Sequence, residues 1–115
     1  MQVGFIVEGF HDENRIANVF GRRFPTVVTQ GTRFTRRTRM DIDKILSEVD
    51  ELYILTDPDE AGDIIANTIQ SEYPQLKRIH VDASKCVYVD RKYRQWTGVE
   101  YAQADYLKEL LSQYI

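Results

Sequence analysis

The fold of this protein is decided by the stretch Leu52-Tyr53-Ile54-Leu55-Thr56-Asp57-Pro58-Asp59-Glu60-Ala61-Gly62. Its first four residues are apolar and mostly branched or aromatic, which predicts a short buried strand. Pro58 disfavours helical conformation at the residue before it, so the chain must leave the strand in a turn. Apolar residues then recur at the spacing of one helix face, at Ala61, Ile64, Ile65, Ile69 and Tyr73. The stretch therefore predicts a strand, a turn with two carboxylates, and a helix.

The two carboxylates of this turn, Asp57 and Asp59, lie at the carboxyl end of a predicted central strand. Ligands of open α/β sheets bind at that edge. Two neighbouring carboxylates repel each other unless a cation lies between them, and a hard divalent ion suits oxygen ligands. Taken alone, an Asp-x-Asp is more typical of a solvated turn in which one aspartate caps the following helix than of a metal site. Features elsewhere in the chain must decide between these interpretations.

Length and composition predict one domain over residues 1–115, with an ordinary globular balance of 43% hydrophobic and 29% charged residues. No apolar stretch approaches the length of a membrane span, and the N-terminus lacks the features of a signal peptide. The single cysteine, Cys86, excludes an intrachain disulfide and a cysteine-cluster zinc site. We therefore expect a cytoplasmic protein.

The net charge of −3 hides a strong asymmetry along the chain. Residues 14–40 contain seven arginines and no acidic residue, whereas residues 41–63 contain nine acidic residues and one lysine. A basic block beside an acidic block suits a protein that attracts a polyanion, although two solvated surfaces could also neutralise each other. We expect an exposed, mobile loop over residues 32–40, whose guanidinium groups bind nucleic-acid phosphates: Arg33, Arg36, Arg37 and Arg39.

The N-terminal half predicts two further strands. Residues 3–7 form an apolar run that suits a strand buried on both faces, and Glu8 follows it at the carboxyl end. Asp12 is expected to cap the next helix. A second strand is predicted over residues 26–29, followed by the loop Gln30-Gly31-Thr32. A helix beginning at Asp41 then precedes the strand of the Asp-Pro-Asp turn.

The C-terminal half predicts a fourth strand over residues 78–81 and a possible fifth over residues 86–89. Residues 90–97 interleave cations with aromatic side chains, a mixture that suits base stacking and a packed surface loop equally well. A last helix carries Ala104, Leu107, Leu111 and Tyr114 on its inner face. The order predicts a three-layer, Rossmann-like α/β fold with a mainly parallel sheet of four or five strands.

Together these motifs resemble the Toprim family, the module of topoisomerases, bacterial primases and certain nucleases. The resemblance rests on Glu8-Gly9 after the first strand, Gln30-Gly31-Thr32 after the second and Asp57-Pro58-Asp59 after the third. Residues 98–102, Gly-Val-Glu-Tyr-Ala, are similar to a Gly-Val-Glu-His-Ala segment in the branch of the 5S ribosomal RNA maturase ribonuclease, with Tyr101 in place of histidine. We expect a small stand-alone Toprim protein that resembles this branch and primase-type Toprim domains.

The resemblance implies that Asp57 and Asp59 bind Mg²⁺, for which Mn²⁺ can substitute. Glu8 would act as general acid or base, or as ligand of a second ion, and the four arginines would hold the nucleic-acid backbone. The implied activity is that of a metal-dependent nuclease or phosphodiesterase acting on RNA or DNA, in RNA processing or DNA repair.

Two other functions remain open at this stage. The chain could be a nucleic-acid-binding module that is an accessory to a larger complex and needs a partner for chemistry. It could also be a metal-binding protein with a small phosphorylated ligand, although the arginines would then lack a purpose. No Ser/His/Asp or Cys/His arrangement is indicated at the same sheet edge, so a nucleophilic hydrolase is disfavoured.

Overall fold

A computed structural model describes residues 2–115 and contains a four-stranded parallel sheet at its centre. The strands are β1 (Val3–Val7), β2 (Thr26–Val28), β3 (Glu51–Ile54) and β4 (Lys77–Arg78), arranged in the order β2-β1-β3-β4. Each neighbouring pair is parallel. The predicted fold class, with a parallel sheet flanked by helices, is therefore confirmed.

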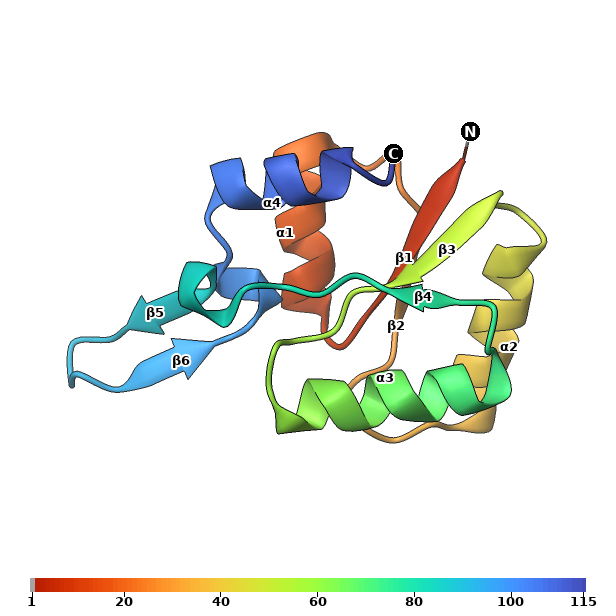
Figure 1. The fold of residues 1–115 in the computed structure, drawn as a ribbon, viewed down its shortest axis with the longest axis horizontal. Coiled ribbons are helices and arrows are strands. Elements are labelled where there is room, and N and C mark those ends of the chain that lie inside the picture. The colour runs from red at the N-terminus through yellow and green to blue at the C-terminus, as the bar shows by residue number, and fades with distance from the viewer. Residues whose placement is uncertain (1) are drawn as a thin grey trace.

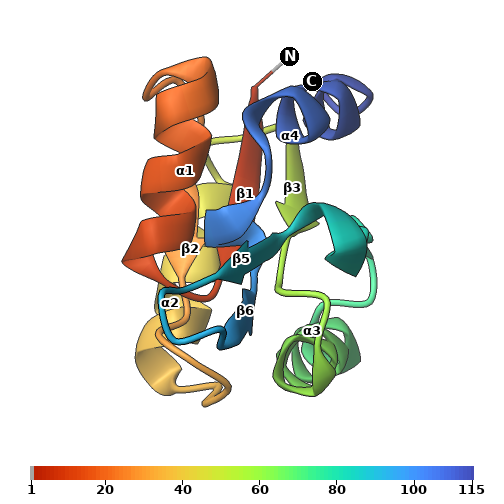
Figure 2. The same cartoon turned by 90° about the vertical axis from the view of Figure 1, so that its left-hand side faces the viewer.

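Two helices cover each face of the sheet (Figures 1 and 2). On one face, α1 (Phe10–Phe20) and α4 (Ala104–Ser112) enclose a core with the side chains of Val3, Phe5 and Val7. On the other face, α2 (Arg36–Leu46) and α3 (Glu60–Glu72) pack over Ile6 and its neighbours. Every residue of β1 is buried, as expected for a central strand. Among residues 2–115, no helix combines the length and apolar character needed to cross a membrane.

The arginine-rich segment differs from the prediction of a mobile loop over residues 32–40. Helix α2 begins at Arg36 rather than at Asp41. Thr35 caps it, because its Oγ1 accepts a hydrogen bond from the Thr38 amide at 3.2 Å. Arginine is a good helix former and Thr38 is buried on the inner face, so the apolar side of the helix starts one turn earlier than its strongest hydrophobic residues suggest.

Asp12 is not the helix cap that the sequence predicts. Helix α1 begins directly after Gly9, which occupies the capping position, and Asp12 lies three residues further along. Its carboxylate accepts a hydrogen bond from the Gly9 amide at 3.0 Å. This is the reciprocal half of a capping box, in which a first-turn acid reaches back to the start of the helix.

The region after β4 forms a projecting hairpin instead of a fifth strand of the central sheet. The fourth strand itself is short, because pairing with β3 covers only Lys77 and Arg78. A 3₁₀ turn, η1 (Ala83–Lys85), then leads into β5 (Val87–Val89), which pairs antiparallel with β6 (Gln95–Thr97). Residues 87–97, here named the arm, extend away from the body of the molecule (Figure 1). A second 3₁₀ turn, η2 (Val99–Tyr101), follows the arm.

Candidate metal centre and nucleic-acid interface

The acidic residues predicted from the sequence meet where the order of the strands reverses. The chain passes from β1 to β2 on one side and then to β3 on the other, so β1 and β3 are neighbours at the switch point. Glu8 follows β1, and Asp57 follows β3 a few residues along the same edge. The two side chains are close enough for a hydrogen bond between their carboxyl groups. This crevice is where ligands of open α/β sheets bind.

Asp57 is held firmly by two distant parts of the chain. Its Oδ1 accepts a hydrogen bond from the Val99 amide at 2.7 Å, and its carbonyl oxygen accepts one from Arg78 Nη2 at 3.1 Å. Arg78 also pairs with Asp63 at 2.6 Å. Because the guanidinium group binds the Asp57 backbone and Asp63, it does not neutralise the Asp57 carboxylate itself.

The turn after β3 is closed by Gly62. Thr56 Oγ1 donates a hydrogen bond to the Gly62 carbonyl at 2.9 Å, and the Gly62 amide donates to Asp59 Oδ1 at 2.7 Å. Asp59 therefore caps α3, the structural role that a bare Asp-x-Asp suggests. The cap uses one oxygen of an exposed carboxylate. A Cβ atom on Gly62 would overlap the Asp57 carbonyl, so the tight turn requires glycine.

Negative charge is concentrated at this edge. Burial, a hydrogen bond with Asp57 and the charges of Asp57, Asp59 and Asp12 raise the pKa of Glu8 to about 8. Burial and the charge of Asp57 likewise raise the pKa of Asp12 to about 7. Within residues 2–115, the buried Oε1 of Glu8 has no hydrogen-bond partner. The site thus combines repelling carboxyl groups with an unsatisfied oxygen.

These features fit a hard divalent cation. The donors are all carboxylate oxygens, which Mg²⁺ prefers, and a cation among them would relieve the repulsion that raises the pKa of Glu8. In the described part of the chain, no group of three or more His, Cys, Asp or Glu side chains is arranged to hold an ion unaided. Mg²⁺ is usually bound by one or two carboxylates, with waters and substrate phosphates completing the shell. One or two ligands of the ion would come from Asp57, Asp59 and Glu8, with waters and substrate phosphates as the others.

Sequence reasoning missed three contributors to this site. Asp12 was predicted only as a cap, although its position soon after Glu8-Gly9 is a local signal for a further acid near the strand end. No comparable signal in the sequence indicates that Arg78 or the Val99 amide contacts Asp57. Their contacts with Asp57 join residues 21 and 42 positions apart, and such pairs depend on the tertiary fold.

The comparison with protein families matches this geometry. A model of the Toprim domain matches residues 3–86. The chain belongs to the Toprim family. Toprim domains in general bind metal ions and are related to nucleic acid, which agrees with the carboxylates at the sheet edge.

Two similar proteins support this assignment. The uncharacterized protein YusF of Bacillus subtilis (strain 168) is 30% identical over 77 residues, which are 67% of this chain and 51% of that protein. The chain therefore spans about half the length of that relative. The solved structure of a small TOPRIM domain protein from Bacillus stearothermophilus superposes with a TM-score of 0.68 at 26% identity, covering 98% of this chain and 85% of that one. The predicted resemblance to a small Toprim protein is confirmed.

The four arginines predicted to bind phosphates have different surroundings in this Toprim chain. Arg39 makes two 2.7 Å contacts with Glu72 of α3 and lies 4.5 Å from the centre of the Phe34 ring. Arg37 pairs with Asp41 one turn along its own helix. Arg33 and Arg36 are exposed, and neither forms an ion pair within residues 2–115. The structure therefore leaves Arg33 and Arg36 the most available for phosphates.

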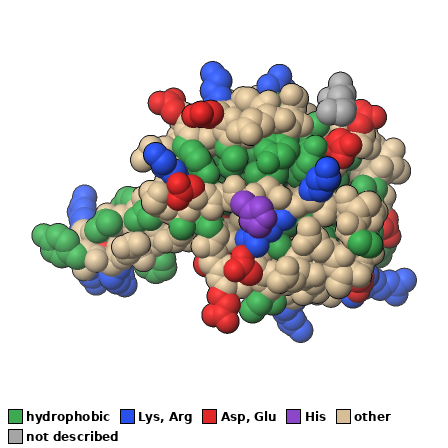
Figure 3. All heavy atoms as spheres, in the orientation of Figure 1, with side chains coloured by type: hydrophobic (Ala, Val, Ile, Leu, Met, Phe, Trp, Pro, Cys, Tyr) green, Lys and Arg blue, Asp and Glu red, His purple; other side chains and the backbone are tan. Residues whose placement is uncertain are grey.

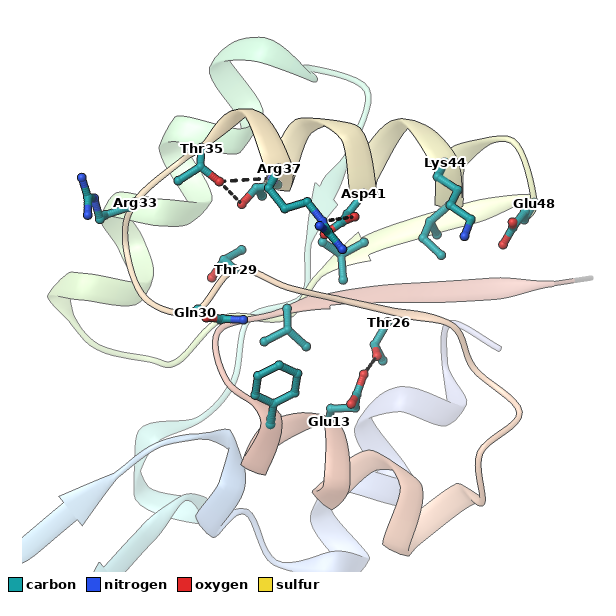
Figure 4. A pocket seen from close by; sticks show the side chains of 15 residues that line it. Glu13, Thr26, Thr29, Gln30, Arg33, Thr35, Arg37, Asp41, Lys44 and Glu48 are labelled. Carbon is teal, nitrogen blue, oxygen red and sulfur yellow. Dashed lines mark hydrogen bonds and ion pairs between the residues drawn. The ribbon is translucent and has the colours of Figure 1, made fainter.

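A groove of about 760 Å³ runs beside the outer edge of β2, between α1 and α2 (Figure 4). Its lining includes Gln30, Arg37 and Lys44, and Arg33 lines one end, where its side chain points outwards. The acidic residues Glu8, Asp57 and Asp59 are not part of the lining. The connection between groove and site is the loop after β2, because the Gly31 amide donates a hydrogen bond to the Glu8 carbonyl at 3.2 Å.

We expect the metal-free Toprim domain to be destabilised by Glu8 and Asp12 as the pH rises. Their pKa values are raised from 4.5 to about 8 and from 3.8 to about 7, so the folded state retains these protons more strongly than the unfolded state. The stabilisation that the folded state gains by retaining these two protons is complete below the pKa values of the unfolded state. It is lost as the pH rises through the pKa values of the folded state. In EDTA, the melting temperature of Glu8→Gln should therefore rise relative to that of the native protein between about pH 5 and about pH 8.

Added Mn²⁺ should raise the melting temperature of the native domain at the upper end of this range and have little effect at the lower end, where protons compete for the carboxylates. A constant difference between Glu8→Gln and native protein across the range would contradict the raised pKa of Glu8.

Proposed function

We propose that this Toprim chain is a metal-dependent phosphodiesterase that hydrolyses nucleic acid. The observation that carries the proposal is the pairing of Glu8 with Asp57 at the switch point. The half-buried Glu8 has a raised pKa there, and its buried Oε1 has no hydrogen-bond partner among residues 2–115. Perturbed acids in a crevice at the carboxyl ends of parallel strands are typical of catalytic sites.

The roles of the residues follow from their surroundings. Asp57 and Asp59 would hold Mg²⁺ or Mn²⁺, which when bound would neutralise the phosphate and activate the attacking water. Asp57 is suited to this because the Val99 amide and Arg78 fix its side chain and backbone. Without a metal ion, burial and the neighbouring carboxylates raise the pKa of Glu8 to about 8. A cation held by Asp57 and Asp59 would lower this pKa, so Glu8 would act as general acid or base, or as ligand of a second ion.

The test of this proposal is cleavage by the purified protein. End-labelled RNA and DNA of the same sequence, each single-stranded and duplex, are incubated with Mg²⁺, with Mn²⁺ or with EDTA. The proposal expects fragments that depend on the metal. Binding of the strands without cleavage under any of these conditions would instead favour the accessory binding module.

The arginine positions give a separate prediction about binding. If Arg33 and Arg36 each contact one phosphate, Arg33→Ala with Arg36→Ala should reduce the logarithmic salt slope for a single strand by about 1.4. Affinity should fall equally for different sequences, because phosphate contacts carry no base information. Anisotropy of a labelled strand at several salt concentrations measures both quantities.

Arg39→Ala is the comparison variant for this experiment. Because Arg39 joins α2 to Glu72 of α3, its replacement should lower the melting temperature. An unchanged salt slope in the double variant would remove Arg33 and Arg36 from the interface.

A further inference from the structure

The arm carries an unusual concentration of exposed aromatic side chains. Tyr93 is 89% exposed, Tyr88 51% and Trp96 45%. Three cations accompany them in the arm, Arg91, Lys92 and Arg94, against one carboxylate, Asp90. Figure 3 shows hydrophobic and basic side chains gathered on this projection from the body. The family match ends at residue 86, so the arm lies outside it.

Tyr88 and Trp96 form an aromatic row on one face of the arm that continues into Tyr101. Tyr88 and Trp96 are directly opposite each other in the β5–β6 pair, and opposite residues share a face of a hairpin. The Tyr88 ring stacks on Tyr101 of η2, with centroids 5.5 Å apart and planes 12° apart. At the other end, the Arg94 guanidinium lies 5.6 Å from the centre of the Trp96 ring. The row thus runs from the arm back to the body.

Asp90 builds the tip of the arm. Its Oδ1 accepts hydrogen bonds from the Lys92 and Arg94 amides, and its Oδ2 accepts from the Arg94 and Trp96 side chains. The Tyr93 amide donates to the Asp90 carbonyl, and the Asp90 amide to the Arg94 carbonyl. The single carboxylate of the arm is therefore used internally, and the outward charge of the arm is positive.

The backbone conformation at Tyr93 is one that a bulky side chain rarely adopts. Its φ of 61° lies in the left-handed region, at the bulge position after a hairpin turn where glycine is preferred. A bulky side chain at this φ is uncommon, and Tyr93 recovers little by packing because 89% of it is exposed. Hairpin geometry does not account for a tyrosine here, whereas a ligand for its ring would.

The arm is attached directly to the candidate metal centre. Its ends are joined by a hydrogen bond from the Gly98 amide to the Cys86 carbonyl at 3.1 Å. The next residue, Val99, donates its amide to Asp57. A Cβ on Gly98 would lie 3.3 Å from Asp57 Oδ1, so the chain leaving the arm passes against that carboxylate.

We propose that the arm binds single-stranded nucleic acid, with unpaired bases stacked on Tyr93, Trp96 and Tyr88 and phosphates held by its cations, and that it leads the strand to Asp57. The last part rests on the proposed function, whereas binding itself does not. Stacking on aromatic rings needs bases whose faces are free, which excludes an intact duplex. A polyanion complements the positive charge of the arm, whereas the arm of a second copy would be repelled by it.

Trp96 makes the proposal directly measurable, because it is the only tryptophan of the chain. The Glu8→Gln protein in EDTA is titrated with a single-stranded oligonucleotide and with the same sequence as a blunt duplex. The expected result is quenching of Trp96 fluorescence by the single strand, with an affinity at least about 10-fold above that for the duplex.

Three replacements of Tyr93 separate stacking from folding. Tyr93→Ala should weaken binding of the single strand by about 5- to 150-fold, and Tyr93→Phe should retain it. Tyr93→Gly should weaken binding to the same degree while raising the melting temperature, since glycine relieves the left-handed backbone. Lys108→Ala, which removes an exposed cation from α4, is the charge control and should bind like the parent.

Three results would overturn the proposal. These are no quenching of Trp96 fluorescence, equal affinity for the single strand and the duplex, or a Tyr93→Gly protein whose weaker binding is accompanied by a lower melting temperature. A dimer in sedimentation that Tyr93→Ala dissociates, with unchanged affinity for the strand, would assign the arm to self-association instead. Binding by the arm without any cleavage by the native protein would refute only the proposed function. Cleavage with an unchanged KM in Tyr93→Ala would refute only the role of the arm.

Discussion

Gly62→Ala should destabilise the protein by about 3 kcal/mol or more, although alanine is ordinarily the better helix former. An added Cβ would overlap the Asp57 carbonyl oxygen and lie 2.8 Å from its carbonyl carbon. These are backbone atoms, held by the hydrogen bond from Arg78, and they cannot move aside as a flexible side chain could. The turn between β3 and α3 must therefore open, and Asp57 must move with it.

Gly9→Ala is the matched control for this variant. It also places a methyl group beside the acidic site, but the nearest atom, Asp12 Oδ2, would lie at an ordinary 3.7 Å. Gly9 has an extended backbone with φ of −140°, so alanine should cost no more than about 1 kcal/mol. Urea unfolding of the three proteins measures the difference, and calorimetry with Mn²⁺ follows the site. Equal stability of Gly62→Ala and native protein would contradict the geometry of this turn.

Glu8→Gln should reduce metal-dependent cleavage by about 10²- to 10⁴-fold while the protein remains folded. Glutamine keeps the shape of the side chain but can neither carry a negative charge nor transfer the proton. The same replacement removes a source of repulsion, so the variant should be no less stable than the native protein in EDTA. Loss of activity without loss of stability is the combination expected of a catalytic or metal-binding carboxylate.

The control for Glu8→Gln is Glu109→Gln, an exposed position on α4 that should leave cleavage unchanged. Initial rates with a labelled strand at saturating Mg²⁺ measure the effect, and Mn²⁺ calorimetry separates the two roles of Glu8. A general acid can be replaced with little change in metal affinity, whereas a ligand cannot. Cleavage at the native rate by Glu8→Gln would exclude both roles.

The central sheet could be predicted because short segments of the sequence indicate where its strands begin and end. The apolar run of β1 and the abrupt Asp-Pro-Asp turn after β3 fix where two strands end, and parallel pairing then brings those ends to one edge. The start of α2 was missed for a physical reason. A run of arginines looks like a loop because it is charged, yet arginine favours helix once Thr35 supplies a cap.

The remaining features depend on contacts that no short segment encodes. Residues 87–89 have the composition of a strand, but only the fold decides whether such a strand joins the central sheet or pairs with β6. The short β4 illustrates this, since two residues complete its pairing and the chain then turns away. The contact of Val99 with Asp57 is likewise invisible in the sequence, because any residue but proline could donate its amide.

The closing hydrogen bond between Cys86 and Gly98 also has an evolutionary consequence. Because the Gly98 amide and the Cys86 carbonyl meet at 3.1 Å, the chain returns to the body beside the point where it left, and η2 and α4 then complete the core. Insertions or deletions between these two points leave both hydrophobic cores intact, since neither core draws on residues 87–97. The length and sequence of the arm can therefore change while both hydrophobic cores of the Toprim body keep their residues.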